Sequence, residues 1–239
     1  MANKLRLYQF LRQSGEIASL EEAKGLVQQR KITVNDKIVP FLHFQINPKK
    51  DVIKINGKEV NITAPKIYLM LNKPVGYITS PQGKDKERNN ILDLIKVEEK
   101  IKKTLFAAGR LDMNTSGLLL ITNDGNFVRR ILHPGNHIEK EYEVKVDNPL
   151  TTEEINKLEK GLKIEINGKK YQTMPAKVQL INDNTYSLII CEGKKRQIRV
   201  MMKTLGHPVL ELKRVRLGKL KLGNLETGKY IEVKKEDIV

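Results

Sequence analysis

The chain has 239 residues, one cysteine and no tryptophan, and its 44 Lys and Arg outnumber its 28 Asp and Glu, which gives a formal net charge of +16 at pH 7. This length suits one large domain or a large and a small one, and the excess of positive charge favours a polyanionic partner, either nucleic acid or an anionic membrane surface. The chain shows no apolar run of membrane-spanning length and no signal region, so we expect a cytoplasmic protein without membrane contact. A single cysteine cannot form an internal disulfide. The one spacing that resembles a pair of metal ligands is His133 with His137, and Pro134 and Gly135 separate these residues, so we expect no metal.

The first sixty residues predict a small, basic α+β module. Apolar residues recur at helical spacing over 4–13, and Ser19 with Glu22 forms a capping box that begins a second helix. Asn35-Asp36 and Asn56-Gly57 are turn formers that separate the expected short strands. These strands are at 32–34, 38–39 and 52–55. The module holds 11 Lys and Arg against 6 acidic residues, so it carries +5 of the net charge.

A larger region of strands and helices follows a short linker at 61–65. Thr151 with Glu154 caps a helix that ends near Gly161. The apolar runs that we expect to be strands are 67–71, 118–121, 142–146, 176–180 and 186–191. We therefore expect an α+β chain with two domains, at 1–61 and 66–239.

Residues 80–90 are rich in Pro, Gly, Lys and Arg and predict a long polar loop. Its basic side chains are able to contact a phosphate backbone. A solvated surface loop without such a role is an equally good interpretation.

The segment 108–125 is the most informative part of the sequence. Asp112 lies beside Arg110 in a turn-rich loop between Gly109 and Gly117, directly before an apolar run that has the length of an interior strand. A carboxylate fixed to a rigid strand is a suitable nucleophile. For an arbitrary Asp in such a loop, however, a turn residue that caps its own backbone is the more common interpretation.

This segment resembles the central motif of the pseudouridine synthases, in the branch that contains the small- and large-subunit ribosomal RNA enzymes. The matching stretches are Gly-Arg-Leu-Asp, Thr-Ser-Gly-Leu-Leu-Leu and Thr-Asn-Asp-Gly, at 109–112, 115–120 and 122–125. The resemblance implies that Asp112 is the catalytic nucleophile, that no cofactor is needed, and that the second domain is built on a mixed, largely antiparallel sheet.

Two further segments resemble motifs of the same family. Lys73 begins a Lys-Pro-x-Gly element, which the family has beside its active site. Because a residue before proline avoids helical geometry, Lys73 must end its strand, so we expect a structural role for it and also count it among the candidate substrate contacts. Tyr142 lies in a Lys-x-Tyr-x-Val strand. The resemblance implies that its ring stacks on an extracted uracil, whereas position alone favours a buried core tyrosine.

Three more site residues come from the C-terminal part of the chain. The Gln-Ile-Arg of residues 197–199 implies that Arg199 lies against the catalytic carboxylate and keeps it ionised. Arg196 belongs to the same basic stripe and is a candidate substrate contact, and Leu212 matches the leucine that packs on the target base. Arg110 is a candidate to occupy the space that the base leaves.

The N-terminal module resembles the αL RNA-binding motif first recognised in a small-subunit ribosomal protein. The match covers 7–11, 19–29 and 30–36, but Leu20 and Glu21 replace the usual paired arginines and Asp36 replaces the usual glycine. The resemblance implies an RNA-binding role. A basic surface with no specific RNA role is the alternative.

These features together predict a monomeric RNA pseudouridine synthase whose partner is ribosomal RNA, with a preference for the large-subunit 23S RNA. The alternatives are a synthase for small-subunit 16S RNA and a catalytically silent ribosome-assembly factor. A glycoside hydrolase that pairs Asp112 with Asp124 is disfavoured, because residues 118–122 alone span about 16 Å as a strand.

Overall fold

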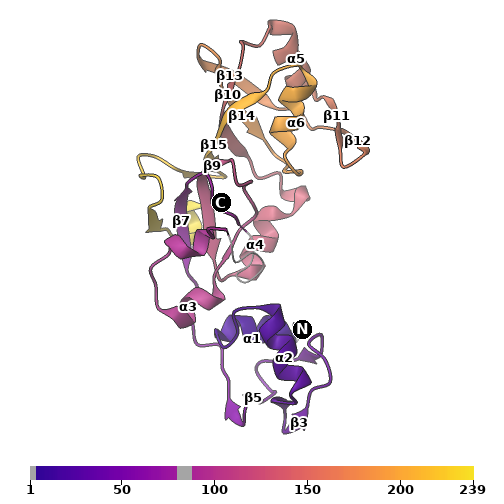
Figure 1. The fold of residues 1–239 in the computed structure, drawn as a ribbon, viewed down its shortest axis with the longest axis vertical. Helices are drawn as coiled ribbons and strands as arrows, with labels where there is room; N and C mark the ends of the chain where they lie inside the picture. Colours follow the sequence, from indigo (N-terminus) through magenta and orange to yellow (C-terminus); the bar gives the residue numbers. More distant parts are fainter. Residues whose placement is uncertain (1–3, 80–87) are drawn as a thin grey trace. The chain divides into compact units, whose positions relative to one another are not determined.

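The computed structural model describes residues 4–79 and 88–239, which form two compact units (Figure 1). The first unit comprises the described residues of Met1–Ile67 and Ser80–Phe106, and the second comprises Tyr68–Thr79 and Ala107–Val239. Within this described part, no helix is long and apolar enough to cross a membrane. Most of the polar loop expected at 80–90 lies outside the described residues.

The first unit is built around two short helices and small sheets. Helix α2 begins where the capping box predicts, because the Ser19 side chain accepts a hydrogen bond from the Glu22 backbone at 3.1 Å and the Glu22 carboxylate accepts one from Ala18 at 2.8 Å. Strands β3, β2, β5 and β6 form one sheet in that order, and β1 pairs with β4. The elements are α1 (Leu7–Ser14), α2 (Leu20–Gln28), β1 (Leu5–Arg6), β2 (Ile32–Val34), β3 (Lys37–Ile38), β4 (Gln45–Ile46), β5 (Ile53–Ile55) and β6 (Lys58–Glu59).

The first compact unit also contains a later segment with η1 (Ile91–Leu94) and α3 (Glu99–Thr104). Ion pairing and hydrogen bonding attach this segment to the end of α1: the Lys100 ammonium lies 2.9 Å from the Glu16 carboxylate, and the Arg12 guanidinium donates to the Leu105 carbonyl at 3.1 Å. The second compact unit is therefore smaller than the domain expected at 66–239. The functional division into 1–61 and 66–239 remains a prediction.

The second unit contains most of a mixed, largely antiparallel sheet, as expected. In the described part of the chain this sheet has nine strands, with the main order β13-β14-β10-β15-β9-β7-β17. The pair β15–β9 is parallel, whereas the other pairs along this order are antiparallel. The strands are β7 (Tyr68–Lys73), β8 (Phe106–Ala107), β9 (Ser116–Thr122), β10 (Lys140–Val146), β13 (Lys177–Asn182), β14 (Thr185–Ile190), β15 (Val209–Leu217), β16 (Leu220–Lys221) and β17 (Tyr230–Glu232).

Helices pack on this sheet, and one separate hairpin packs against α6. Helix α5 contacts β13, and α6 contacts both β15 and the hairpin strand β11 (Figure 1). The Thr151–Glu154 capping box begins α5, as the sequence predicts. The bounds are α4 (Gly125–Leu132), η2 (Pro134–Asn136), α5 (Thr152–Lys160), α6 (Gln197–Thr204), η3 (Lys235–Asp237), β11 (Lys163–Ile166) and β12 (Lys169–Gln172).

Candidate active site

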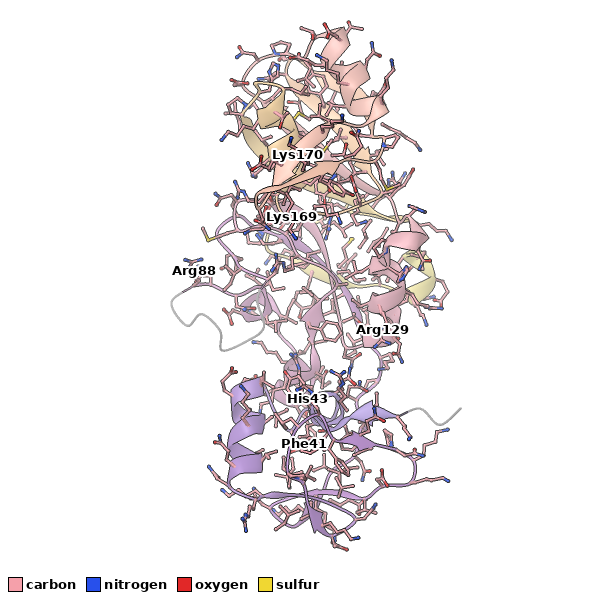
Figure 2. All side chains as sticks on the ribbon, turned by 90° about the vertical axis from the view of Figure 1, so that its right-hand side faces the viewer. Phe41, His43, Arg88, Arg129, Lys169 and Lys170 are labelled. Atoms are coloured by element: carbon pink, nitrogen blue, oxygen red, sulfur yellow. The ribbon has the colours of Figure 1, made fainter. Side chains whose placement is uncertain are left out.

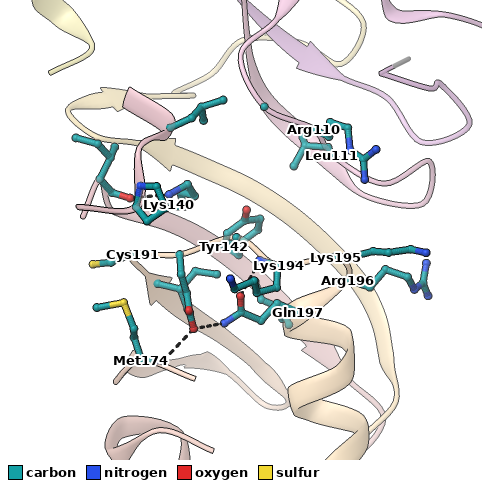
Figure 3. A pocket seen from close by; sticks show the side chains of 18 of the residues that line it. Arg110, Leu111, Lys140, Tyr142, Met174, Cys191, Lys194, Lys195, Arg196 and Gln197 are labelled. Carbon is teal, nitrogen blue, oxygen red and sulfur yellow. Dashed lines mark hydrogen bonds between the residues drawn. The ribbon is translucent and has the colours of Figure 1, made fainter. Parts of the chain in front are cut away.

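A cavity of about 630 Å³ opens in the second unit, between the Asp112 loop (residues 109–117), β10 and the segment that leads into α6 (Figure 3). Five of the seven predicted site residues line it. These are Arg110, Asp112, Tyr142, Arg196 and Leu212. The other two, Lys73 and Arg199, do not line the cavity; they donate hydrogen bonds to backbone carbonyls of the Asp112 loop.

The backbone of the Asp112 loop is held at consecutive positions. Each carbonyl oxygen from Leu111 to Thr115 accepts at least one hydrogen bond. In the order of the accepting carbonyls, from Leu111 to Thr115, the donors are the Thr79 hydroxyl at 3.2 Å, the Thr115 amide at 3.0 Å, the Gly76 amide at 2.9 Å, the Arg199 guanidinium at 2.7 Å and the Lys73 ammonium at 2.9 Å. The Asp112 side chain takes no part in these bonds. The loop therefore holds its carboxylate at the cavity without using it as a structural cap, unlike the common turn Asp.

Lys73 is the centre of this arrangement. It ends β7, as predicted, and its side chain is fully buried. Its ammonium donates to the carbonyls of Pro74 and Thr115 at 2.9 Å, and more weakly to those of Asp112 and Met113 at 3.3 and 3.4 Å. Burial lowers the pKa of Lys73 from its ordinary value to about 8, although the nearby Asp112 carboxylate acts in the opposite direction. In this geometry Lys73 holds the loop and does not reach the cavity.

The two glycines that bracket the loop are required by its backbone. Both have positive φ, +84° at Gly109 and +99° at Gly117. At Gly117, an added Cβ would lie 2.2 Å from the Arg214 carbonyl oxygen, because β9 runs beside β15 at this point. A side chain here would push the first residues of β9 away from β15.

Arg199 differs from the expectation. Instead of an ion pair with Asp112, its guanidinium donates to the carbonyls of Asn114 at 2.7 Å and Val209 at 3.1 Å. Among the described residues its Nε has no hydrogen-bond partner, although it is buried. Burial and the charge of Arg196 lower the pKa of Arg199, while the charge of Asp112 raises it. The Asp112 carboxylate therefore interacts electrostatically with Arg199 without forming a hydrogen bond to it. Arg199 therefore connects α6 to the Asp112 loop through the backbone.

Tyr142 and Leu212 form an apolar wall of the cavity. Tyr142 belongs to the inward face of β10, where Val144 and Val146 are also buried, so the predicted strand alternation is confirmed. Leu212 lies on β15 opposite Val144. In Figure 3, Tyr142 lies centrally, with Arg110 and Leu111 above it and Lys194 and Gln197 below. A flat ring and an aliphatic side chain at the same cavity provide a surface on which a planar base can pack.

Arg110 and Arg196 are exposed residues on the rim of the cavity. Arg196 directly precedes α6 and has a left-handed backbone, with φ +53°. Lys194 and Lys195 line the same rim. These four cations make the entrance attractive to a phosphodiester backbone.

Asp124 takes a different role from Asp112. Its carboxylate accepts a hydrogen bond from the buried Tyr68 hydroxyl at 2.8 Å and one from the Phe127 amide at 3.1 Å, where it caps α4. It does not line the cavity. The structure thus offers no pair of carboxylates in which Asp112 and Asp124 act together.

Sequence reasoning missed a hydrogen-bonded cluster around Glu192. The Glu192 carboxylate accepts a hydrogen bond from the Tyr171 hydroxyl. It also accepts hydrogen bonds from the Met174 amide at 2.9 Å and from the Gln197 side-chain amide (Figure 3). The Gln197 oxygen in turn accepts from the Lys194 amide at 2.9 Å. These contacts connect β12 to the basic rim.

A signal for this cluster was present in the sequence. Tyr171 reaches Glu192 because β11 and β12 form a hairpin, whose turn is Asn167-Gly168 with both residues at positive φ. Such a dipeptide between two strand-like runs indicates a hairpin, although we did not predict one here. The hydrogen bond to Glu192 and burial raise the pKa of Tyr171 to about 12, so its hydroxyl stays a donor at neutral pH.

We expect Tyr171→Phe to lower the free energy of unfolding in urea by about 1–2 kcal/mol, because the Glu192 carboxylate loses a donor in a partly buried site. The matched control is Tyr77→Phe, since no hydrogen bond involves the Tyr77 hydroxyl in the described structure. The control should change stability by less than about 0.5 kcal/mol. Equal effects of the two substitutions would show that the Tyr171–Glu192 bond does not stabilise the rim.

Comparison with known proteins gives a consistent result. The family described as RNA pseudouridylate synthase matches residues 67–204. A solved structure titled "Crystal structure of pseudouridylate synthase" superposes with a TM-score of 0.70 at 30% sequence identity and covers 98% of both chains.

Similar curated proteins include enzymes named for either ribosomal subunit. The ribosomal large subunit pseudouridine synthase B of Bacillus subtilis is 36% identical, over 98% of this chain and 93% of its own. The ribosomal small subunit pseudouridine synthase A of Escherichia coli is 33% identical over 89% of each chain. An RNA pseudouridine synthase of Aquifex aeolicus is 35% identical over 98% of this chain and 94% of its own.

Proposed function

This chain belongs to the RNA pseudouridylate synthase family, and from that premise we propose that it isomerises a uridine of ribosomal RNA with Asp112 as the nucleophile. The observation that carries the proposal is the geometry of the Asp112 loop: its carbonyls are bonded, while its carboxylate is left available at a cavity. The excess of positive charge supports an RNA substrate.

The reaction is an isomerisation, so its atoms balance without a co-reactant. The Asp112 carboxylate attacks the uridine, the glycosidic bond from N1 breaks, and the base turns within the cavity. A bond then forms between C5 and the ribose, the bond between Asp112 and the uridine breaks and returns the free carboxylate, C5 loses a proton, and N1 gains one. Attack on the sugar and attack on C6 of the base are both compatible with this outcome. No step needs a metal or an organic cofactor.

The other site residues have roles that follow from their positions. Tyr142 and Leu212 hold the extracted base from the apolar wall of the cavity. Arg199 acts as a positioning residue, because it fixes the Asn114 carbonyl in the Asp112 loop. Lys73 acts in the same way from the other side of the loop. These two residues keep the carboxylate in place while the base rotates.

The basic rim helps to bind the RNA around the target. A uridine must leave its stack to reach Asp112, which costs a few kcal/mol. Arg110 and Arg196 lie on the exposed rim, where contacts with flanking phosphates offset this cost. Arg110 is also next to Asp112 and is our candidate to fill the space that the base leaves.

We further propose that residues 1–61 act as an αL RNA-binding module and that the target lies in 23S RNA. The module's charge of +5 supports the first point. The similarity to a large-subunit enzyme supports the second, although relatives of similar identity carry small-subunit names, so 16S RNA is the alternative.

Mapping pseudouridines in ribosomal RNA tests this function. We expect cells that lack the protein to lose one modification, or a few, in 23S RNA, and the parent gene to restore them. Loss of a 16S modification would move the target to the small subunit. An unchanged map, with normal binding of ribosomal RNA, would favour a silent assembly factor.

A further inference from the structure

The first unit exposes an aromatic loop, residues 41–44, that the proposed chemistry does not use. The Phe41 side chain is 54% exposed and that of Phe44 is 36% exposed. Their rings meet edge to face, with centroids 6.2 Å apart. His43, which lies between them in the sequence, is also exposed; Figure 2 labels Phe41 and His43. Two of the chain's five phenylalanines thus lie at the surface of one short loop.

The backbone of this loop is fixed although its rings are exposed. The Phe44 carbonyl accepts a hydrogen bond from the Leu7 amide at 2.8 Å, and the Leu42 carbonyl accepts one from the Tyr8 amide at 3.2 Å. The Leu42 side chain points into the core, where it is 7% exposed. The loop is therefore anchored to α1 on both sides of His43, and its aromatic residues are presented in a defined geometry at little further entropic cost.

The charge around the aromatic loop favours a polyanion. From Lys37 to Lys50 the chain contains three lysines and no Asp or Glu, and the Asp51 carboxylate that follows accepts hydrogen bonds from the Asn35 side chain at 3.0 Å and the Asn47 amide at 2.7 Å. Arg6, which is exposed, pairs in register with Gln45 directly after the loop. Asp36, the acidic residue before this stretch, is bound to the Lys54 ammonium at 2.6 Å. A partner with negative charge and flat apolar groups matches this surface better than an apolar protein face does.

We propose that the aromatic loop binds unpaired bases of RNA by stacking on Phe41 and Phe44. The choice of RNA as the partner rests on the proposed function. Unpaired bases expose π-faces that stack on aromatic side chains, whereas bases in a duplex are covered by their neighbours. The loop then selects single-stranded segments of the RNA, and Arg6, whose strand pairs with β4 directly after the loop, binds an adjoining phosphate.

Binding of a short single-stranded RNA to the full chain tests this inference, with the same sequence annealed to its complement as a second probe. We expect Phe41→Leu and Phe44→Leu each to weaken single-strand binding about tenfold, because leucine keeps an apolar surface but offers no ring for stacking. Binding of the duplex should stay unchanged. The salt dependence of single-strand affinity should keep its slope, since neither substitution removes a phosphate contact.

Two controls separate ring stacking from general apolar contact and from the attraction between charges. Ile38→Ala alters an equally exposed apolar side chain of the same stretch, 54% exposed, and should leave binding unchanged. Arg6→Gln should reduce the slope of the salt dependence, because a cation is lost.

Three results would overturn the proposal. The first is unchanged single-strand affinity in both phenylalanine variants. The second is an equal loss in Ile38→Ala, which would indicate a general apolar docking face for protein. The third is a loss of duplex affinity equal to the loss of single-strand affinity, which would show that the rings do not distinguish unpaired bases. Pseudouridine formation by the parent is measured separately, so failure of the catalytic proposal would leave these binding results interpretable.

Discussion

Replacing Asp112 by asparagine should reduce pseudouridine formation about a thousandfold or more, while the protein folds and binds RNA as before. The amide is nearly isosteric with the carboxylate but is not a nucleophile. The hydrogen bonds that hold the loop use its backbone and not the Asp112 side chain, so the variant should keep the geometry of the site. Turnover of a ribosomal RNA fragment and circular dichroism measure the two effects.

Asp183→Asn is the matched control, because it makes the same chemical change at an exposed turn. It should retain parental activity. An RNA with 5-fluorouridine at the target adds a second measurement, since the fluorine occupies the carbon where the new bond must form. The parent should give a protein–RNA adduct or a rearranged product, and Asp112→Asn should give neither. Turnover of Asp112→Asn within tenfold of the parent would reject Asp112 as the nucleophile.

Lys73→Met should lower the free energy of unfolding by about 2–4 kcal/mol and remove most activity. The methionine fills the buried space but donates nothing to the carbonyls of Pro74 and Thr115, and burying an acceptor without a partner costs about 1–3 kcal/mol. The Asp112 loop should then lose its fixed position. Urea unfolding and turnover are the measurements, and Lys169→Met, on the exposed face of β12, is the control. Parental stability of Lys73→Met would show that the loop is held by its other donors.

The difference in the free energy of unfolding between the parent and Lys73→Met should depend on pH with a definite sign. The pKa of Lys73 is about 8 in the folded protein, below the ordinary value of 10.5. Between these two values the unfolded chain binds more protons at this residue than the folded protein does, so stability rises with pH. The parent should therefore become more stable relative to Lys73→Met as the pH rises from about 8 to about 10.5. A difference that stays constant over this range would show that Lys73 keeps its ordinary pKa.

The sequence by itself determined the local elements that have local causes. Ser19 and Thr151 begin helices because their side chains accept hydrogen bonds from residues three positions later. Lys73 ends its strand because a proline follows it. The alternation of β10 placed Tyr142 on the buried face. In each case the deciding interaction lies within a few residues of chain, so the pattern of residue types was sufficient to predict it.

The tertiary structure alone decided which side chains meet around Asp112. Arg199 is 85 residues from Asn114 in the chain, and Lys73 is 42 residues from Thr115, yet both bind carbonyls of the same loop. Backbone carbonyls are identical at every residue, so no sequence pattern identifies which of them an arginine or a buried lysine will bind. The resemblance to a family indicated that Arg199 acts near Asp112, but the contact through Asn114 depends on how α6 packs against β15 and on the pairing of β15 with β9. That packing is a property of the whole sheet, and it determines how the carboxylate is held at the cavity.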